Sequence, residues 1–399
     1  MVGATATTCQ VKGAWKLLAS AHSAGAFTVI GGPHPSCLPG ESLATGVVDC
    51  VVRGEGEETM AELADRVAGG GNASGLAGAS WHEGVRAVSG PDRPSIHELD
   101  SLPFPAWGIF PRLASYGNPQ PLLSRLKPAF PIMTSRGCPY GCTFCFKGVF
   151  GREWRSRSPE SVLREWEWLA GPMGAREIAV QDDSFNIDRD RALRICRAIA
   201  SAGLRVPWST PNGIRADRVD GEVLEAMRES GCIRVSFGVE SGDQGILDRL
   251  GKGETLAQMK SAFGLARQAG LRATGFFMFG NLGEDEGTME STIRFALAVD
   301  PFYAQFTMAT PYPGTALYDG VVRDGELLER DWDRFGHYTA HGFFRHGNVT
   351  PEGVGGAIRG AYRRFYLRPV AVRRLVGDRG ALGRIAEVVR GAFHLLGGM

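Results

Sequence analysis

The 399-residue sequence has almost no excess charge of either sign, because Lys and Arg total 44 and Asp and Glu total 43. A nucleic-acid-binding protein needs a basic surface, so we expect no nucleic-acid partner. The sequence also lacks an apolar run of the roughly 20 residues that cross a bilayer, which predicts no transmembrane segment. No basic stretch followed by an apolar one opens the chain, so no secretory signal is predicted and the cytoplasm is the expected compartment.

A disulfide framework is missing as well. Five of the eight cysteines are scattered along the chain, namely Cys9, Cys37, Cys50, Cys196 and Cys232. A chain of this length buries enough apolar surface to fold without bridges. We therefore interpret these five cysteines as small buried hydrophobic residues in a reducing compartment.

The other three cysteines lie close together in the segment RGCPYGCTFCFK, from Arg136 to Lys147. Three thiolates on one loop, at Cys138, Cys142 and Cys145, can bind three irons of a 4Fe-4S cluster and leave the fourth iron without a protein ligand. Such an open position is where a substrate or cosubstrate binds to a metal. A zinc site is the alternative, but it would need a fourth Cys or His at ligand spacing.

The C-x-x-x-C-x-x-C spacing, with an aromatic residue just before the last cysteine, resembles the cluster loop of the radical S-adenosyl-L-methionine (SAM) superfamily. The resemblance implies that Cys138, Cys142 and Cys145 hold the cluster and that the open iron chelates the amino and carboxylate groups of SAM. It also implies that Phe144 lies against the adenine of SAM. A core aromatic residue is the alternative interpretation of Phe144.

From about Pro131 onward, apolar strands alternate with amphipathic helices. Six strands are predicted, in PIMTSRG, EIAVQDD, VPWSTPNG, CIRVSFGVES, RATGFFMFG and FYAQFTMATP. Parallel strands joined by crossover helices make α/β the predicted fold class. Six of them correspond to the partial (β/α)6 TIM barrel of the radical SAM core, whose active site we expect at the carboxyl ends of the strands.

Polar residues follow the second and third predicted strands. Asp182 and Asp183 end the second, where the family contacts the amino group of SAM, and a carboxylate suits an ammonium. Alternation turns one of the two away from the barrel mouth, and a helix N-cap is the alternative role for Asp183 or Ser184. Ser209 and Arg215 follow the third strand. Arg215 would steer the SAM carboxylate or the substrate, with a surface ion pair as the alternative.

Further candidates follow the last three predicted strands. Glu240 and Ser241 end the fourth, which the family uses to contact the ribose hydroxyls of SAM. The segment GFFMFGNLGEDEGT resembles a family phrase that ends in Gly-x-Pro-Gly-Glu, and Leu282 takes the place of its proline while Glu284 is kept. A slightly different turn is therefore expected there. Tyr312, after the sixth strand, is a candidate to face the cavity.

The first 68 residues also alternate between strands and helices, with strands predicted in VGATATT, FTVIGGPHP and VDCVVRG. The segments GGPHP and VVRGEGEET resemble the second half of the Rossmann-like cobalamin-binding domain that is fused to many radical SAM enzymes. In such sheets the ligand binds beyond the carboxyl ends of the strands, where Gly31, Gly32 and Gly54 would permit close approach. Turn chemistry is the alternative explanation of these glycines.

The first half of that domain has no counterpart in the sequence, because its Asp-x-His-x-x-Gly segment occurs nowhere. A half-sheet would leave an exposed edge, so we hypothesise that the gene starts upstream of Met1. A stop codon in frame close before Met1 would contradict this hypothesis. Whether the shortened domain binds cobalamin, and whether the cobalt has a protein ligand below it, stays open.

Four parts are predicted along the chain: a truncated cobalamin-binding domain at 1–68, a linker at 69–125, the radical SAM core at 126–325 and a carboxyl-terminal helical segment at 326–399. The linker contains a predicted hairpin, and prolines keep the rest of it extended. The last part carries an arginine-rich stretch with few acids near it in sequence, made of Arg363, Arg364, Arg368, Arg373 and Arg374. An anionic substrate or a membrane surface would suit it, and a solvated helix face is the alternative.

The resemblance implies three cofactors: a 4Fe-4S cluster, S-adenosyl-L-methionine and cobalamin. In this architecture the reduced cluster cleaves SAM to a 5′-deoxyadenosyl radical, and the substrate radical then takes a methyl group from methylcobalamin. C-methylation of an unactivated carbon in a small-molecule or lipid intermediate is the predicted activity, with flavodoxin or ferredoxin as the electron donor. A radical cyclisation or rearrangement on the same scaffold is one alternative, and a truncated, inactive cluster-binding protein is another.

Overall fold

The computed structural model describes residues 1–110, 126–336, 342–347 and 349–377. It divides into two compact units, each assembled from separate stretches of the chain. The first unit contains Met1–His97, Gly137–Glu153 and Ala309–His346, and the second contains Glu98–Arg136, Trp154–Met308 and the chain from Gly347 onward. No helix in the described ranges is both long and apolar enough to span a bilayer. The predicted domain boundaries stay a prediction.

The sheet of the first unit has five strands in sequential order. They are β1 (Val2–Thr5), β2 (Thr28–Gly31), β3 (Cys50–Val52), β4 (Ala79–Glu83) and β5 (Arg86–Ser89). The first three are parallel, while β4 is antiparallel to β3 and to β5. The predicted strands and the hairpin are therefore confirmed. The hairpin also extends the sheet, because its first strand covers the edge of β3.

Helix α1 (Val11–Ser23) crosses over between the parallel strands β1 and β2, and α2 (Pro33–Cys37) and α3 (Pro39–Leu43) lie between β2 and β3. Helix α4 (Glu57–Ala68) connects β3 to the antiparallel β4. A fifth helix, α11 (Ala316–Arg323), comes from the third stretch of the unit. One buried cluster joins the strands to α4 and the hairpin, and it consists of Val29, Cys50, Val52, Leu63, Ala73, Leu76, Ala79 and Trp81. Of the five scattered cysteines, Cys50, Cys196 and Cys232 are buried as predicted, whereas Cys37 is half-buried. The prediction is wrong for Cys9, which is exposed.

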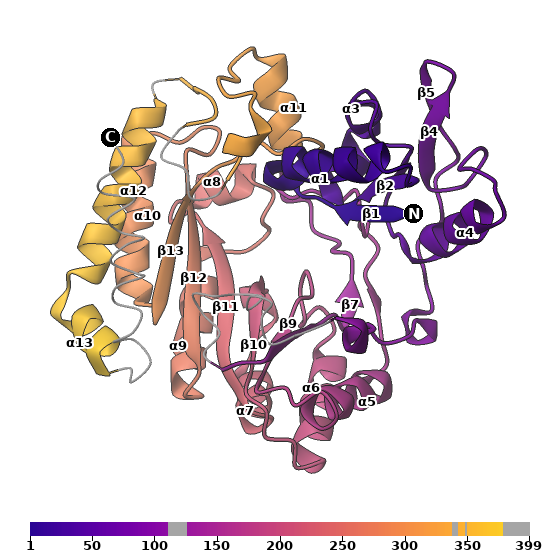
Figure 1. The fold of residues 1–399 in the computed structure, drawn as a ribbon. Helices are drawn as coiled ribbons and strands as arrows, with labels where there is room; N and C mark the ends of the chain where they lie inside the picture. The colour runs from indigo at the N-terminus through magenta and orange to yellow at the C-terminus, as the bar shows by residue number, and fades with distance from the viewer. Residues whose placement is uncertain (111–125, 337–341, 348, 378–399) are drawn as a thin grey trace. The chain divides into compact units, whose positions relative to one another are not determined.

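The second unit holds a six-stranded, fully parallel sheet in the order β13-β12-β11-β10-β9-β6. Its strands are β6 (Ala129–Ile132), β9 (Glu177–Val180), β10 (Trp208–Ile214), β11 (Cys232–Glu240), β12 (Arg272–Phe279) and β13 (Tyr303–Met308). All six predicted strands are confirmed (Figure 1). Because the strands are parallel, their carboxyl ends share one edge of the sheet, and β6 and β13 remain its two outer strands.

Eight helices of the second unit are described. They are α5 (Pro159–Ala170), α6 (Arg189–Ser201), α7 (Gly221–Glu229), α8 (Gln244–Arg249), α9 (Leu256–Gln268), α10 (Glu286–Val299), α12 (Pro351–Tyr366) and α13 (Pro369–Gly377). In most of them the side chain of the N-cap residue accepts a hydrogen bond from a backbone amide of the first turn. These N-cap residues are Ser158, Asp188, Asp220, Asp243, Thr255, Asp285 and Thr350. Such caps stabilise a helix by about 1 kcal/mol each.

The outer edge of β13 is covered by α12, which lies beside it in Figure 1. The Tyr362 hydroxyl donates to the Phe306 carbonyl at 3.2 Å, and the Tyr366 hydroxyl donates to the Ala304 carbonyl at 2.7 Å. Aromatic packing of Phe306 on Tyr362 completes the contact. These bonds satisfy strand groups that an open edge would expose, so the predicted carboxyl-terminal helical segment closes this side of the sheet.

The arginine-rich stretch on α12 and α13 is partly neutralised by acids that the sequence places far away. Arg364 pairs with Glu290 on α10, and Arg368 and Arg374 pair with Asp300 at the end of α10. Few acids lie near the stretch in sequence, but the fold supplies acidic partners to these three arginines. They attach the last helices to α10, because the crossover helix brings its acids to the same side of the sheet.

Candidate functional site

The cysteine loop leaves the second unit through a short ladder. Strand β7 (Ser135–Arg136) pairs antiparallel with β8 (Arg155–Ser156), so the residues on either side of the loop are held together. The loop itself, residues 137–153, belongs to the first compact unit. Because β7 and β8 are paired, the two ends of residues 137–153 lie side by side and the segment forms a closed loop. A closed loop allows several of its side chains to bind one group.

Within the loop, the backbone turns sharply before the first cysteine. Gly137 has φ +81°, and a Cβ atom there would overlap the carbonyl of Glu153, so no other residue fits this position. The amide of Cys145 donates to the carbonyl of Cys142 at 3.2 Å. This bond fixes the turn between the second and third cysteines.

The three cysteines of the loop differ in their burial. Cys138 is buried, Cys142 and Cys145 are half-buried, and none of the three forms a disulfide. Among the described residues no three His, Cys, Asp or Glu side chains converge closely enough to hold one metal ion. Thiolates that each bind a different iron of a cube are spread more widely than the ligands of one ion. Cluster binding by these cysteines stays a prediction, and the zinc alternative finds no ligand set in the described ranges.

The cysteine loop packs against other segments of the first unit. The Phe146 ring lies so close to Gly314 that a Cβ atom there would be 2.6 Å from the ring and 2.7 Å from the Cys37 sulfur. The amide of Leu317 on α11 donates to the Thr143 carbonyl at 3.0 Å. The loop therefore packs with the end of α2 and with α11. Phe144, the predicted adenine contact, is half-buried, and its role stays a prediction.

The three glycines predicted to approach cobalamin differ in what surrounds them. Gly32 has φ +100°, and a Cβ atom there would lie 2.6 Å from the Thr5 hydroxyl, so the chain after β1 already fills this space. At Gly31 the nearest atom would be a carbonyl of β3 at 3.3 Å. Gly54 has φ +68° and only the Val149 carbonyl nearby, at 3.8 Å. Turn and packing demands thus explain Gly32, while Gly54 leaves room for a bound group.

A polar network that the sequence analysis missed joins the first 68 residues to the chain after β13. His34 at the start of α2 is buried, and its ring nitrogens lie 2.9 Å from the Glu41 carboxylate and 3.3 Å from the Thr8 hydroxyl. The Trp332 indole donates to the other Glu41 oxygen at 2.7 Å. Burial would raise the pKa of Glu41, but these hydrogen bonds outweigh it and lower the pKa. The network engages both nitrogens of His34, and the histidine in GGPHP was its only sequence signal.

In the second unit, Asp182 and Asp183 follow β9 at the carboxyl edge of the sheet. Asp182 is buried, at 2% exposed, while Asp183 is exposed. The two side chains thus have different surroundings, as alternation along a strand predicts, and which of them faces the barrel mouth stays a prediction. The N-cap alternative for Asp183 or Ser184 is wrong, because α6 begins at Arg189 and Asp188 is its cap. Of the pair, only Asp183 presents its carboxylate to solvent.

Ser209 does not lie at the end of its strand. Strand β10 continues to Ile214 through an irregular register, so Ser209 is its second residue, and the expectation that it follows the strand is wrong. Its hydroxyl accepts from the buried guanidinium of Arg234 at 3.2 Å. The sequence misplaced the strand end because Pro211 and Gly213, normally turn signals, lie inside the strand. A cofactor contact by Ser209 stays a prediction.

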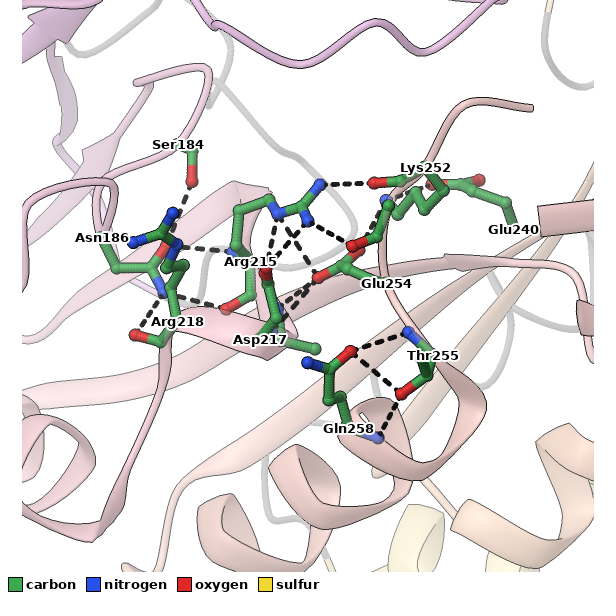
Figure 2. A network of polar contacts seen from close by, with 12 residues as sticks. Ser184, Asn186, Arg215, Asp217, Arg218, Glu240, Lys252, Glu254, Thr255 and Gln258 are labelled. Atoms are coloured by element: carbon green, nitrogen blue, oxygen red, sulfur yellow. Dashed lines mark hydrogen bonds and ion pairs between the residues drawn. The ribbon is translucent and has the colours of Figure 1, made fainter. Parts of the chain in front are cut away.

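Arg215, directly after β10, is 7% exposed and lies at the centre of a charged network (Figure 2). Its guanidinium donates to the Asp217 carboxylate at 2.8 Å and to the Lys252 carbonyl at 2.7 Å. The Glu254 carboxylate lies 3.6 Å from the guanidinium and accepts from the amide of Ala216 at 2.7 Å. The surface-ion-pair alternative is therefore wrong, because the pair is buried. Arg215 holds two loops together.

Glu240 ends β11 with an unusual backbone. Its φ is +66°, a conformation that costs a non-glycine residue about 1–2 kcal/mol, and the ladder to β12 shifts register at this point. Such strain is typical of functional positions. The carboxylate lies 3.5 Å from the ammonium of Lys252, which is also 3.4 Å from Glu254 (Figure 2). Burial raises the pKa of Glu240, and Lys252 counteracts this rise.

Two residues that the sequence analysis did not single out shape the surroundings of Glu240. A Cβ atom at Gly238 would overlap the Glu240 carboxylate and lie 2.8 Å from the Lys252 nitrogen, so both side chains fold back over a bare α-carbon. Ser241 points elsewhere: it is fully buried, and its hydroxyl lies 3.3 Å from that of Thr292 on α10. The predicted contact of Ser241 with ribose stays a prediction. The Glu240 side chain is the more exposed of the two, at 13%.

The loop after β12 is organised by Glu284. Its carboxylate accepts from the amides of Gly280 at 2.6 Å and Asn281 at 2.9 Å, which closes a turn in which Leu282 replaces the family's proline. The second carboxylate oxygen is buried without a hydrogen-bond partner in the described part of the chain. Burial is the main reason that the pKa of Glu284 rises to about 7. In the first unit, Tyr312 is half-buried beside Phe335, and burial raises its pKa; its place in the cavity stays a prediction.

The comparisons with known families agree with this architecture. Residues 132–296 match the model of the Radical SAM superfamily, and residues 1–64 match that of the B12 binding domain. An uncharacterized methyltransferase of Pyrococcus horikoshii is 35% identical over 402 residues, which cover 99% of this chain and 84% of that protein. The chain is therefore a member of the radical SAM superfamily that carries a B12-binding domain, and the predicted family is confirmed. Its cofactors are accordingly a 4Fe-4S cluster, SAM and cobalamin.

Two further relatives have more specific names. The anaerobic magnesium-protoporphyrin IX monomethyl ester cyclase of Cereibacter sphaeroides is 30% identical over 86% of this chain and 55% of that protein. The cytidylyl-2-hydroxyethylphosphonate methyltransferase of Streptomyces wedmorensis is 32% identical over 75% of this chain and 62% of that protein. The chain thus spans less than two thirds of the length of these two relatives.

Solved structures share the fold at low sequence identity. The radical SAM methyltransferase TsrM from Kitasatospora setae, with cobalamin and a 4Fe-4S cluster bound, has a TM-score of 0.72 at 18% identity and covers 96% of this chain and 84% of its own. The cobalamin-dependent radical enzyme OxsB, with aqua-cobalamin and SAM bound, has a TM-score of 0.73 at 17% identity and covers 99% and 63%. A likeness of this kind confirms the predicted fold, a B12-binding domain followed by a radical SAM barrel.

Proposed function

We propose that this enzyme is a cobalamin-dependent radical SAM methyltransferase that methylates an unactivated carbon of a small-molecule or lipid intermediate. The observation that carries the proposal is the loop of Cys138, Cys142 and Cys145 with C-x-x-x-C-x-x-C spacing, whose two ends are held together by the pairing of β7 with β8. When bound, the cluster and SAM supply radical formation and cobalamin supplies the methyl group. The chain's own residues hold and orient these groups. Support for methylation comes from the 35% identical methyltransferase, which this chain covers almost completely.

Each proposed contact follows from the chemistry of a side chain. Cys138, Cys142 and Cys145 supply three thiolates for a cluster with one open position. Asp183, the exposed member of its pair, supplies a carboxylate for the ammonium of SAM. Glu240 supplies a second carboxylate, held by Lys252, which would accept hydrogen bonds from the ribose hydroxyls.

The domain at residues 1–68 is the proposed cobalamin site. A ligand of a parallel sheet binds beyond the carboxyl ends of its strands, and Gly54 after β3 offers a left-handed backbone with free space beside it. Gly31 and Gly32 contribute indirectly, because they let the neighbouring strands and turn approach closely. Titration of the purified protein with aqua-cobalamin, followed by its visible spectrum, tests this assignment, and an unchanged cobalamin spectrum would contradict it.

The experiment for the reaction is anaerobic reconstitution with iron and sulfide, followed by SAM and a strong reductant. We expect 5′-deoxyadenosine and methionine from the wild type and neither product from a Cys138→Ala, Cys142→Ala, Cys145→Ala triple variant. Absence of both products from the fully reconstituted wild type would contradict the proposal and favour an inactive cluster-binding protein. Flavodoxin or ferredoxin is the proposed physiological donor, and the cytoplasm the proposed compartment.

A radical cyclase is the second candidate, because a 30% identical relative carries that name. The two reactions leave different products: methylation adds one methylene equivalent to the substrate, whereas oxidative cyclisation removes hydrogen. With SAM labelled in its methyl group, a methyltransferase places the label in the product and a cyclase does not. Candidate substrates come from the neighbouring genes.

A further inference from the structure

The segment between β6 and the cysteine loop is held by one buried carboxylate. Asp182 accepts from the Thr134 amide at 2.6 Å, from the Thr134 hydroxyl at 2.5 Å and from the Ser135 hydroxyl at 2.7 Å. Thr134 and Ser135 are themselves fully buried. Thus every hydrogen bond that the structure gives the Asp182 carboxylate comes from the two residues that lead into the ladder before the loop.

The carbonyl groups of the same segment are held by two arginines. The Thr134 carbonyl accepts from the guanidinium of Arg191 at 2.6 Å and from the Arg157 amide at 3.0 Å. The Met133 carbonyl accepts from the guanidinium of Arg157 at 3.2 Å. Arg157 in turn pairs with the buried carboxylate of Glu165 on α5. We call Asp182, Arg157, Arg191 and Glu165 the exit clamp.

The exit clamp places charged side chains in the interior, where a charge is costly unless it is paired. Asp182, Glu165 and Arg191 are each 2% exposed, and Arg157 is half-buried. Burial raises the pKa of Asp182 and lowers that of Arg191, and their mutual attraction acts against both shifts. The clamped residues are followed after Arg136 by the loop, which returns at β8. The residues next to both ends of the loop are therefore held in place.

We propose that Asp182 is a positioning residue for the 4Fe-4S cluster rather than a ligand of SAM. It holds Thr134 and Ser135, which lead into the pairing of β7 with β8, and so keeps together the two ends of the loop whose thiols at Cys138, Cys142 and Cys145 hold the cluster. This inference rests on the proposed function of the loop. It assigns the predicted contact with the SAM ammonium to Asp183 alone.

The test measures cluster binding and loop order separately from activity. Asp182→Ala should bind at least threefold less iron and sulfide per chain after reconstitution than the wild type, and its apo-protein should be cut faster by trypsin at Lys147 and Arg152. Asp182→Asn should bind an intermediate amount, because its amide oxygen still accepts from the Thr134 amide and its NH2 can donate to hydroxyls that rotate. Reduced wild type and Asp182→Asn should give the same EPR signal shape.

Glu254→Gln is the matched control. Glu254 is also a buried carboxylate that accepts from backbone amides, those of Ala216 and Asp217, but it holds a different loop. Both Asp182→Ala and Glu254→Gln should lower the melting temperature, and only Asp182→Ala should lose iron. Equal loss of iron in both variants would overturn the proposal, because general destabilisation would then explain it.

A second outcome separates this inference from the proposed function. If Asp182→Ala binds iron like the wild type but loses affinity for SAM, Asp182 is a SAM ligand and the positioning role is wrong, while the proposed function stands. If instead the triple cysteine variant retains its iron, the loop is not the cluster site and the proposed function fails with the inference.

Discussion

The contact between Gly238, Glu240 and Lys252 allows a prediction that can be worked out from distances. A methyl group at Gly238 would overlap the Glu240 carboxylate and lie 2.8 Å from the Lys252 nitrogen. Contacts between heavy atoms of these kinds need about 3.5 Å, so both side chains must move away from the strand. Gly238→Ala therefore disturbs the carboxylate proposed to bind ribose without removing it.

The expected size of the effect follows from the hydrogen bonds that are weakened. A hydrogen bond to a charged group is worth about 1.5–3 kcal/mol and a neutral one about 0.5–1.5 kcal/mol. Losing the charged character of one bond thus costs about 1–1.5 kcal/mol, which is a roughly five- to tenfold weaker SAM affinity. Lys252→Met should also weaken SAM binding, because the ammonium that opposes the raised pKa of Glu240 is gone.

The assay is equilibrium binding of SAM to reconstituted, unreduced protein across pH. The proposed contact needs the ionised carboxylate, so wild-type affinity for SAM should fall as the pH drops through the raised pKa of Glu240. The charged groups around it are Lys252 and Glu254, with Arg215 and Asp217 beyond them. In Lys252→Met the fall should begin at a higher pH, whereas Lys252→Arg should behave like the wild type.

Gly264→Ala on α9 is the matched glycine control, since a Cβ atom there meets nothing within 4 Å. It should bind SAM like the wild type. The reasoning is refuted if Gly238→Ala binds SAM as tightly as Gly264→Ala, or if the pH profile of Lys252→Met coincides with that of the wild type.

Three further predictions concern stability. Because folding raises the pKa of Glu284 from 4.5 to about 7, the folded state holds more protons in this interval and wild-type stability should fall as pH rises through it; Glu284→Gln should flatten this slope in melting curves. Trp332→Phe removes the indole bond to Glu41 and should cost about 1 kcal/mol in denaturant unfolding, with no loss expected if that bond is unimportant. Gly32→Ala should cost roughly 2–4 kcal/mol, because its methyl group meets the Thr5 hydroxyl and its φ is +100°; a variant as stable as the wild type would contradict this.

Periodicity was sufficient to predict most of the fold. The six strands of the barrel sheet are long apolar runs between amphipathic helices, so their number and order were readable from sequence. Strand β10 shows the limit, because it contains Pro211 and Gly213, two residues that normally end strands. The hairpin was predicted as part of a linker, since sequence alone does not tell which edge a strand will join. Its pairing with β3 depends on packing between distant residues.

The candidate site was predictable only where residue type and spacing determine chemistry. Three cysteines at short spacing indicate a cluster whatever surrounds them. Single carboxylates do not indicate a function by their spacing. Asp182 and Asp183 are neighbouring residues of the same type, and only the structure shows that the first is buried and the second exposed. Lys252 and Gly238 could not be found in advance either. Their roles arise from a bulge and a left-handed residue at the end of β11, which bring three separate sequence positions together.

The most direct test is EPR spectroscopy of the anaerobically reconstituted, reduced protein before and after SAM is added. A cluster held by Cys138, Cys142 and Cys145 has one iron open to SAM, so the signal should change in shape when SAM binds, and the triple alanine variant should give no such signal. A cluster signal that stays the same with saturating SAM would contradict the account.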